Sequence, residues 1–95
     1  MPFDLRQLRY AIAAADHGSF RRAADALRLK QSTLSRRIRL MEQRVGAQLF
    51  ERTRIGVRPT LAGVEFLRNA RRLIEQAESM RAAASAAGRG EAGRL

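Results

Sequence analysis

The sequence has no cysteine and a single histidine, His17. The absence of cysteine excludes a disulfide scaffold, a zinc ribbon and a thiol nucleophile. One histidine cannot build a histidine-rich metal site, and His17 has no evident nucleophile to activate. We therefore expect a protein of a reducing cytoplasm that carries no metal and no other cofactor.

Long apolar runs are also missing. No segment approaches the roughly 20 apolar residues that cross a membrane, and residues 1–4 lack the charged and apolar regions of a signal peptide. A chain of 95 residues suits one domain with little room for a deep substrate cleft. Because no catalytic site assembles from these residues, we expect neither an enzyme nor a membrane protein.

Acidic residues are scarce: there are 9 Asp and Glu against 19 Lys and Arg, which gives a net charge of +10. Residues 28–58 hold nine of the basic residues but only two of the acidic ones, a local charge of +7. A segment of this kind favours a polyanion as partner. The clustering is the better signal, because a GC-rich genome can enrich arginine along a whole chain.

Capping residues mark the first helix. Asp4 and Gln7 have the spacing of a capping box, which predicts a helix over residues 5–16. Gly18 follows as the residue that ends this helix, because glycine adopts the left-handed conformation that a helix C-terminus often needs.

The next two helices flank a short break. Ser19 is placed to cap a helix over residues 20–27, and residues 28–30 form a tight turn. The third helix begins near residue 31 or 32 and stops at Gly46. Two short helices with a compact turn, the second of them basic, predict a helix-turn-helix.

The third helix has two different faces. Its apolar stripe repeats at i, i+4, i+7 and i+11 and consists of Leu34, Ile38, Met41 and Val45. The opposite face is polar and consists of Ser32, Arg36, Arg39 and Gln43. Such a helix can grip its own domain and also enter a DNA major groove, about 12 Å wide, where Arg36 can bind a guanine in bidentate fashion. The alternative is a polar face that is merely solvated. Leu40 lies outside the stripe, and we expect it to pack against the first helix or against the wing, a hairpin predicted over residues 49–58.

A hairpin follows the third helix. Residues 49–52 and 57–58 are predicted as short strands around a turn at residues 53–56. Pro59 ends the second strand because it cannot donate to a ladder. The predicted fold class is therefore mainly α: a winged helix-turn-helix with a long C-terminal linker helix.

The last helix is expected to begin after Thr60 and to run to about residue 87, roughly 40 Å at 1.5 Å per residue. This divides the chain into a winged helix-turn-helix domain (1–59), a linker helix (60–87) and a flexible tail (88–95).

Two apolar stripes run along this linker helix. One recurs at spacings of 4, 3, 4, 3 and 4 and consists of Phe66, Ala70, Leu73, Ala77, Met80 and Ala84. The other, Val64, Leu67 and Ile74, can pack on the chain's own helices. One long helix cannot bury both stripes against so small a domain, so we expect the first to be the seam of a homodimer. The alternative is a monomer whose helix folds back or frays after Ala77.

Much of this pattern resembles a known family. The residues concerned are Ser19-Phe20, Ala23-Ala24, Leu27, Gln31, Leu34-Ser35-Arg36, Ile38, Glu42, Gly46, Leu49-Phe50, Arg52, Thr60 and Ala62-Gly63. Over residues 3 to about 85 the chain resembles the N-terminal domain of LysR-type transcriptional regulators. The resemblance implies a bacterial, sequence-specific DNA-binding transcription factor whose third helix reads the major groove, with the wing near the minor groove. It also implies antiparallel pairing of linker helices, which sets two reading helices about 34 Å apart.

The resemblance implies roles for individual residues as well. The reading positions it indicates on the third helix are Gln31, Ser32, Thr33, Ser35 and Arg36, and the polar face adds Arg39. The wing contacts are Arg52, Arg54 and Arg58. Lys30 stands where the family often has a small polar cap. Full-length members continue into an effector-binding domain, which this chain does not include, so we assign no effector.

Three other kinds of protein fit the sequence less well. An adaptor would use the long helix for assembly and the basic charge for nonspecific contact, but it needs no polar face opposite Leu34. A membrane-surface helix would need bulky apolar residues opposite its basic face, whereas the linker helix is rich in alanine. An RNA reader would favour aromatic stacking platforms, whereas the aromatic residues here have mostly core spacing.

Overall fold

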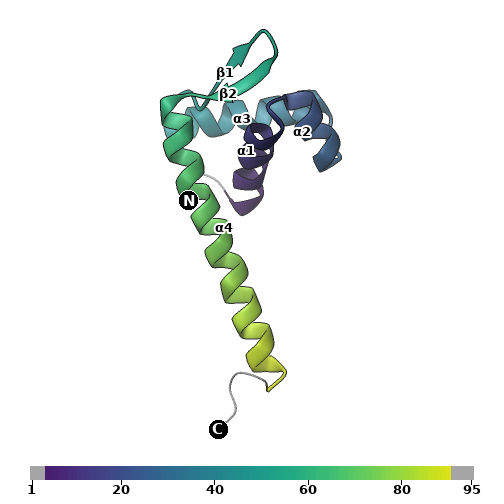
Figure 1. Cartoon of the computed structure of the whole chain (residues 1–95), viewed down its shortest axis with the longest axis vertical. Coiled ribbons are helices and arrows are strands. Elements are labelled where there is room, and N and C mark those ends of the chain that lie inside the picture. Colours follow the sequence, from purple (N-terminus) through teal and green to yellow (C-terminus); the bar gives the residue numbers. More distant parts are fainter. Residues whose placement is uncertain (1–3, 91–95) are drawn as a thin grey trace.

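The computed structural model describes residues 4–90. Along the chain its elements are α1 (Leu5–His17), α2 (Phe20–Leu27), α3 (Gln31–Val45), β1 (Phe50–Thr53), β2 (Gly56–Pro59) and α4 (Leu61–Gly88). The first three helices and the hairpin, residues 4–60, form a unit that we call the head, and α4 projects from it (Figure 1). The molecule measures 58 × 26 × 19 Å. This arrangement confirms the predicted fold class.

The first two helices begin as their capping residues predict. Asp4 Oδ1 accepts the backbone N–H of Gln7 at 2.9 Å, and Gln7 Oε1 accepts that of Asp4 at 3.1 Å, which completes the capping box. Ser19 Oγ accepts the N–H of Arg22 at 3.2 Å. Gly18 between the helices is left-handed, with φ 65°. These side chains satisfy N–H groups that have no partner inside a helix.

The turn between α2 and α3 contains a feature that sequence reasoning missed. Arg28 is left-handed, with φ 60° and ψ 44°, a conformation that costs a residue with a Cβ about 1–2 kcal/mol. Its N–H donates to Asp25 O at 3.2 Å, and the Leu29 N–H donates to Ala24 O at 2.9 Å. These backbone hydrogen bonds at the end of α2 therefore stabilise a left-handed conformation that usually requires glycine.

The core lies where α1, α2 and α3 meet under the hairpin. Leu34, Ile38 and Met41 are buried, as the stripe on α3 predicts. Val45 is 37% exposed, so its assignment to the stripe is wrong: it is the last residue of α3, next to the terminating Gly46. Leu40 is 39% exposed, so the predicted packing against the wing or α1 does not bury it.

The hairpin pairs Phe50 with Pro59 and Thr53 with Gly56 in antiparallel register. Its first strand begins one residue later than predicted. Leu49 is buried and stands outside the ladder: its N–H donates to the Glu42 side chain, and its carbonyl accepts the N–H of Thr60. Pro59 is the last paired residue of β2, as expected of a residue without an N–H.

The near end of α4 is built into the head. Thr60 Oγ1 accepts the N–H of Gly63 at 3.0 Å, which confirms the predicted cap. Gly63 is so close to the head that a Cβ there would lie 2.0 Å from Leu49 O. Further along, Arg71 Nη2 lies 2.7 Å from Asp16 Oδ1 at the end of α1.

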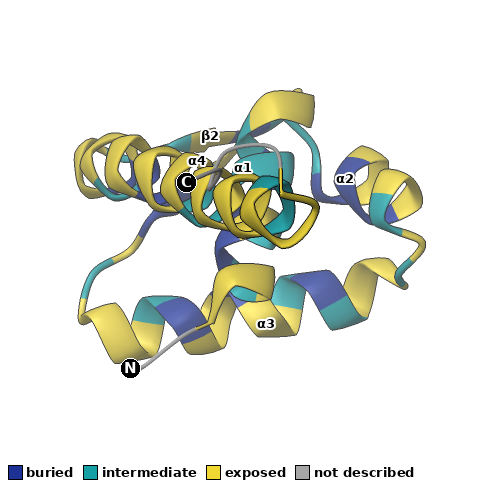
Figure 2. Ribbon diagram, turned by 90° about the horizontal axis from the view of Figure 1, so that it is seen from below, coloured by how far each residue is buried: buried dark blue, intermediate teal, exposed yellow. Residues whose placement is uncertain are grey.

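The far end of α4 is different. In the described part of α4 no residue beyond Ala70 is buried, and the helix is exposed along most of its length (Figure 2). It ends at Gly88, one residue later than predicted. Of the tail expected over residues 88–95, residues 91–95 lie outside the described part of the chain.

Candidate nucleic-acid interface

The outer face of α3 carries the predicted reading residues. Gln31, Ser32, Arg36 and Arg39 are exposed, while Thr33 and Ser35 are half-buried. Within residues 4–90 neither Arg36 nor Arg39 forms a hydrogen bond or an ion pair. Because α3 grips the head with its opposite face, these two guanidinium groups are held at the surface with their donors free.

The N-terminus of α3 is open. Its N-cap residue, Lys30, is extended and makes no side-chain hydrogen bond to the helix, so it does not act as a small polar cap. The Lys30 carbonyl accepts the N–H groups of Thr33 and Leu34, both at 3.1 Å. The helix end therefore keeps its partial positive charge beside the exposed Ser32, an arrangement that suits a phosphate.

The wing is pinned to the turn between α1 and α2. Val57 N–H donates to Gly18 O at 3.0 Å. Gly56 has φ 152°, and a Cβ there would lie 2.0 Å from the same carbonyl oxygen. Only glycine allows this approach, so Gly56 serves the docking of the hairpin as well as its turn.

The tip of the wing is ordered by one hydroxyl group. Thr53 Oγ1 accepts the N–H of Ile55 at 3.3 Å and donates to Gly56 O at 3.2 Å. Ile55 is 95% exposed. Arg54 beside it is exposed and forms no hydrogen bond or ion pair with the described residues. The tip thus presents an arginine whose donors are all available.

The other two wing arginines have partners within the chain. Arg58 Nε lies 2.6 Å from Glu51 Oε1, across the two strands. Arg52 Nη2 donates to Ser35 Oγ at 3.4 Å, and its Cζ lies 5.0 Å from the ring centroid of Phe20. The three wing arginines that the sequence groups together therefore differ in their contacts: Arg52 contacts α2 and α3, Arg58 pairs with Glu51, and Arg54 has no partner among the described residues.

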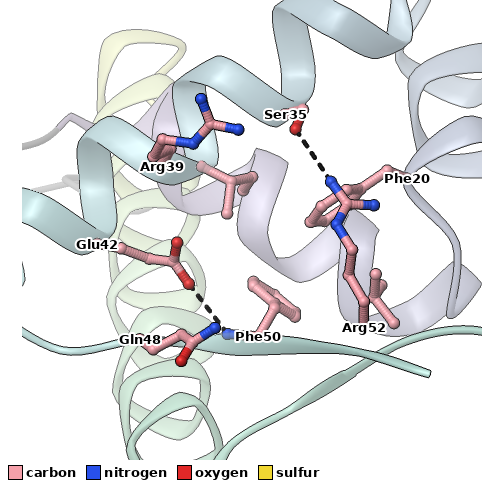
Figure 3. A pocket seen from close by; sticks show the side chains of 9 residues that line it. Phe20, Ser35, Arg39, Glu42, Gln48, Phe50 and Arg52 are labelled. Atoms are coloured by element: carbon pink, nitrogen blue, oxygen red, sulfur yellow. Dashed lines mark hydrogen bonds between the residues drawn. The ribbon is translucent and has the colours of Figure 1, made fainter.

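A pocket between α3 and β1 contains this Arg52 contact (Figure 3). On its other side Glu42 Oε2 accepts the N–H groups of Leu49 and Phe50, at 2.7 and 3.1 Å. Glu42 thereby attaches the start of the wing to the reading helix. Sequence reasoning noted Glu42 only as part of a family pattern. The signal for its role is a lone acidic residue on an arginine-rich helix, seven positions before the predicted start of a strand.

Charge is arranged differently on α4. Glu65 pairs with Arg68 at 2.9 Å, and Glu78 pairs with Arg81 at 2.8 Å. Hydrogen bonds and charge from Arg81 lower the pKa of Glu78. These local pairs balance much of the charge of α4, whereas Arg36 and Arg39 on the outer face of α3 have no acidic partner within residues 4–90.

The predicted seam on α4 is only partly available. Ala70 is 2% exposed because it packs into the head. Phe66 and Ala77 are half-buried, whereas Leu73 and Met80 are 43% and 64% exposed. An apolar stripe thus remains uncovered beyond Ala70.

Residues 4–90 contain neither a membrane-spanning helix nor a cluster of metal ligands. No helix there is long and apolar enough to cross a membrane. No group of three or more His, Cys, Asp or Glu in the same part of the chain is arranged to hold a metal ion.

Comparison with known proteins gives consistent matches. The family described as "Bacterial regulatory helix-turn-helix protein, lysR family" matches residues 5–64. The "HTH-type transcriptional regulator ClcR" of Pseudomonas putida is 47% identical over 97% of this chain, and this chain spans 31% of that protein. The "HTH-type transcriptional regulator TfdT" of Cupriavidus pinatubonensis is 42% identical over 97% of this chain, which spans 40% of it. The chain thus spans about a third of the length of such curated relatives.

Solved structures agree in fold. A crystal structure of CbnR_DBD in complex with DNA has a TM-score of 0.85 and 36% identity, covering 90% of this chain and 99% of that one. A crystal structure of BenM_DBD with catB site 1 DNA has a TM-score of 0.91 and 33% identity, covering 98% of this chain and all of that one. The head and the projecting helix therefore have counterparts in both structures.

Proposed function

This chain is a winged helix-turn-helix DNA-binding domain of the LysR family of bacterial regulatory proteins, and we propose that it binds specific sequences of double-stranded DNA. One observation carries the proposal: Arg36 and Arg39, which make no hydrogen bond or ion pair within residues 4–90, lie on α3 beside a wing that is fixed to the head and carries Arg54 at its tip. Rigid placement of free donors is what base recognition requires. We infer a role in regulating transcription, in the bacterial cytoplasm at the nucleoid, and assign no catalytic activity.

The reading role belongs to the outer face of α3. Arg36 is the best candidate for a base contact, because it is free and lies one turn into the helix, where a bidentate contact with guanine O6 and N7 is favourable. Ser32 and Thr33 at the open N-terminus are short enough to let the helix approach the DNA closely. Gln31 and Arg39 extend the same surface in both directions along the groove.

The wing contributes a second contact. Arg54 at the tip reaches the minor groove or its phosphates, and a narrow groove attracts arginine. Arg58 faces the same partner more weakly, since Glu51 already neutralises it. Arg52 belongs to the interface as well, where its guanidinium group contacts Ser35 on α3 and Phe20 on α2.

Two copies of the chain would bind one paired site. The uncovered stripe beyond Ala70, with Leu73, Ala77 and Met80, is the proposed seam between two α4 helices, and Phe66 borders it nearer the head. Antiparallel pairing would put the two α3 helices on successive major grooves, about 34 Å apart. Because alanine contributes little buried area, we expect the dimer of this chain alone to be weak.

The chain matches only part of its curated relatives, so we propose no effector-binding function for it. This chain spans about a third of its curated relatives. For this chain we propose that it reads DNA and that two copies pair through α4.

Selection of bound sequences from a random DNA pool tests the proposal. We expect an interrupted inverted repeat whose two halves are separated by one helical turn. Binding to a scrambled duplex serves as the control. Equal affinity for every sequence would contradict the proposal and favour an adaptor that uses its charge without reading bases.

A further inference from the structure

Arg52 makes two contacts that single it out from the other wing arginines. Its Nη2 donates to Ser35 Oγ on α3 at 3.4 Å, and its Cζ lies 5.0 Å from the ring centroid of Phe20 on α2. Figure 3 shows the guanidinium group between these two partners. One side chain of the wing therefore joins both helices of the helix-turn-helix.

The aromatic partner of Arg52 is itself held in place. Phe20 is 7% exposed, and its ring meets that of Phe50 edge-on, with centroids 6.0 Å apart and an interplanar angle of 75°. A guanidinium group over a fixed ring face gains a cation–π attraction and loses freedom. The contact with Ser35 is thus made by a group that is already oriented.

The contact determines what the Ser35 hydroxyl can do. A serine hydroxyl has one donor and two acceptor sites, whereas a guanidinium group has donors only. Arg52 therefore uses a lone pair of Ser35 Oγ and leaves the O–H free. In residues 4–90 Ser35 Oγ has no other hydrogen bond, including the bond to the preceding helical turn that serine often makes.

We propose that Arg52 is a positioning residue that holds Ser35 as a hydrogen-bond donor toward an acceptor on DNA. The proposal rests on the function proposed above, because Ser35 lies on the α3 surface that would face the DNA. The acceptor is an oxygen or nitrogen lone pair, either of a phosphate or of a base edge in the major groove. Ser35 and Arg52 then act as one unit, whereas Arg54 acts alone.

A double-mutant cycle tests this unit. The variants are Ser35→Ala, Arg52→Ala and the double substitution, each measured on the sequence that the unmodified chain selects. We expect each single change to weaken specific binding by roughly fivefold, the loss of about one hydrogen bond. The double change should cost no more than the larger single one. Independent, multiplying effects would overturn the proposal, because a direct phosphate contact by Arg52 needs no Ser35.

Conservative variants separate position from charge. Ser35→Thr keeps the hydroxyl and should retain most of the binding. Arg52→Lys keeps the charge but loses the planar fork that can stack and donate together, so it should bind like Arg52→Ala. Full binding by Arg52→Lys would mean that only the charge matters and would overturn the proposal. Thermal unfolding of each variant checks that the head stays folded.

Modified DNA identifies the acceptor. One set of duplexes carries single methylphosphonates, and the other carries bases that lack one acceptor, such as 7-deazapurines, 2-aminopurine or 5-methyl-2-pyrimidinone. The modification at the Ser35 acceptor should weaken binding of the unmodified chain several-fold and leave Ser35→Ala unaffected. If no modification depends on Ser35, the hydroxyl does not donate to DNA and the proposal fails.

The same experiments distinguish this failure from failure of the proposed function. A chain with no sequence preference would contradict DNA reading itself. A chain that selects its sequence, while Ser35 and Arg52 contribute independently, would contradict only the positioning role.

Discussion

The two ends of α4 are in different surroundings. Its first turns lie against the head, where Gly63, Leu67 and Ala70 are buried. Its later turns, beyond the ion pair of Arg71 with Asp16, bury no residue and keep Leu73 and Met80 exposed. The same helix therefore serves the fold at one end and is available to a partner at the other.

The difference shows which interactions the chain supplies for itself. Around the head, turns and strands are fixed by caps, close glycine contacts and the Glu42 carboxylate. Beyond Ala70 the helix is maintained by its own hydrogen bonds and by Glu–Arg pairs on its surface, such as Glu78 with Arg81. Exposed pairs of this kind contribute little. We expect substitutions to act on folding at the near end and on assembly at the far end.

The sharpest contrast uses one substitution at two glycines of α4. Gly63→Ala places a Cβ 2.0 Å from Leu49 O, which also accepts the Thr60 N–H. We expect a loss of about 3 kcal/mol in unfolding free energy, at the upper end for overpacking. Gly88→Ala meets nothing within 4 Å and should change stability by less than about 0.5 kcal/mol. Urea unfolding measures both, and similar effects would contradict the contrast.

A charge on the exposed seam tests assembly. Leu73→Asp should give monomers by sedimentation and lower affinity for a paired site by on the order of 100-fold, because bivalent binding is lost. Ser79→Asp adds the same charge to an exposed position off the seam and should keep the pairing. A monomer at high concentration from the unmodified chain, both free and on paired-site DNA, would rule out the dimer.

A single arginine on α3 tests reading by the head. Arg36→Ala should cost about 1–3 kcal/mol at the selected site and much less on scrambled DNA. Arg72→Ala removes the same charge from α4 and should leave the ratio of specific to nonspecific affinity unchanged. Competition binding measures this ratio. An equal loss on both DNAs would make Arg36 a phosphate contact.

The smallest expected effect concerns the wing tip. Arg54→Ala should reduce the slope of log affinity against log salt by about one, the value for one phosphate contact. Arg58→Ala should change it less, because Glu51 lies 2.6 Å from that guanidinium. Titrations at several salt concentrations compare the two variants. An unchanged slope for Arg54→Ala would mean that the tip stays away from the DNA.

Local rules predict most of the fold. The capping box at Asp4, the caps at Ser19 and Thr60 and the stop at Gly46 act within a few residues, so their spacing is visible in the sequence. Element ends were less predictable. β1 begins at Phe50, where the Glu42 carboxylate accepts the N–H groups of both Leu49 and Phe50, and no strand propensity records that contact.

The candidate site was predictable only as a surface. Periodicity and charge indicate that α3 has a polar face, and the structure confirms its exposure at Arg36 and Arg39. The different surroundings of Arg52, Arg54 and Arg58 depend on which side chains the fold brings near, here Ser35, Phe20 and Glu51. Those partners are up to 32 positions away in sequence, as 52 is from 20, and spacing alone does not reveal them.

The ion pair between Arg71 and Asp16 joins α4 to the head, and further along the helix the charge of Arg9 on α1 also acts on Glu78. From Arg71 to its end at Gly88 the helix is roughly 25 Å long, at 1.5 Å per residue. A rotation of this part of the helix by about 10° around Arg71 would displace its far end by roughly 4 Å. In two chains paired along these helices, a small rotation of each helix relative to its head would change the distance between the two heads by several ångströms. If two chains pair in this way, the range of half-site spacings that they can bind would depend on how firmly Gly63, Leu67 and Ala70 hold the near end of α4 against the head.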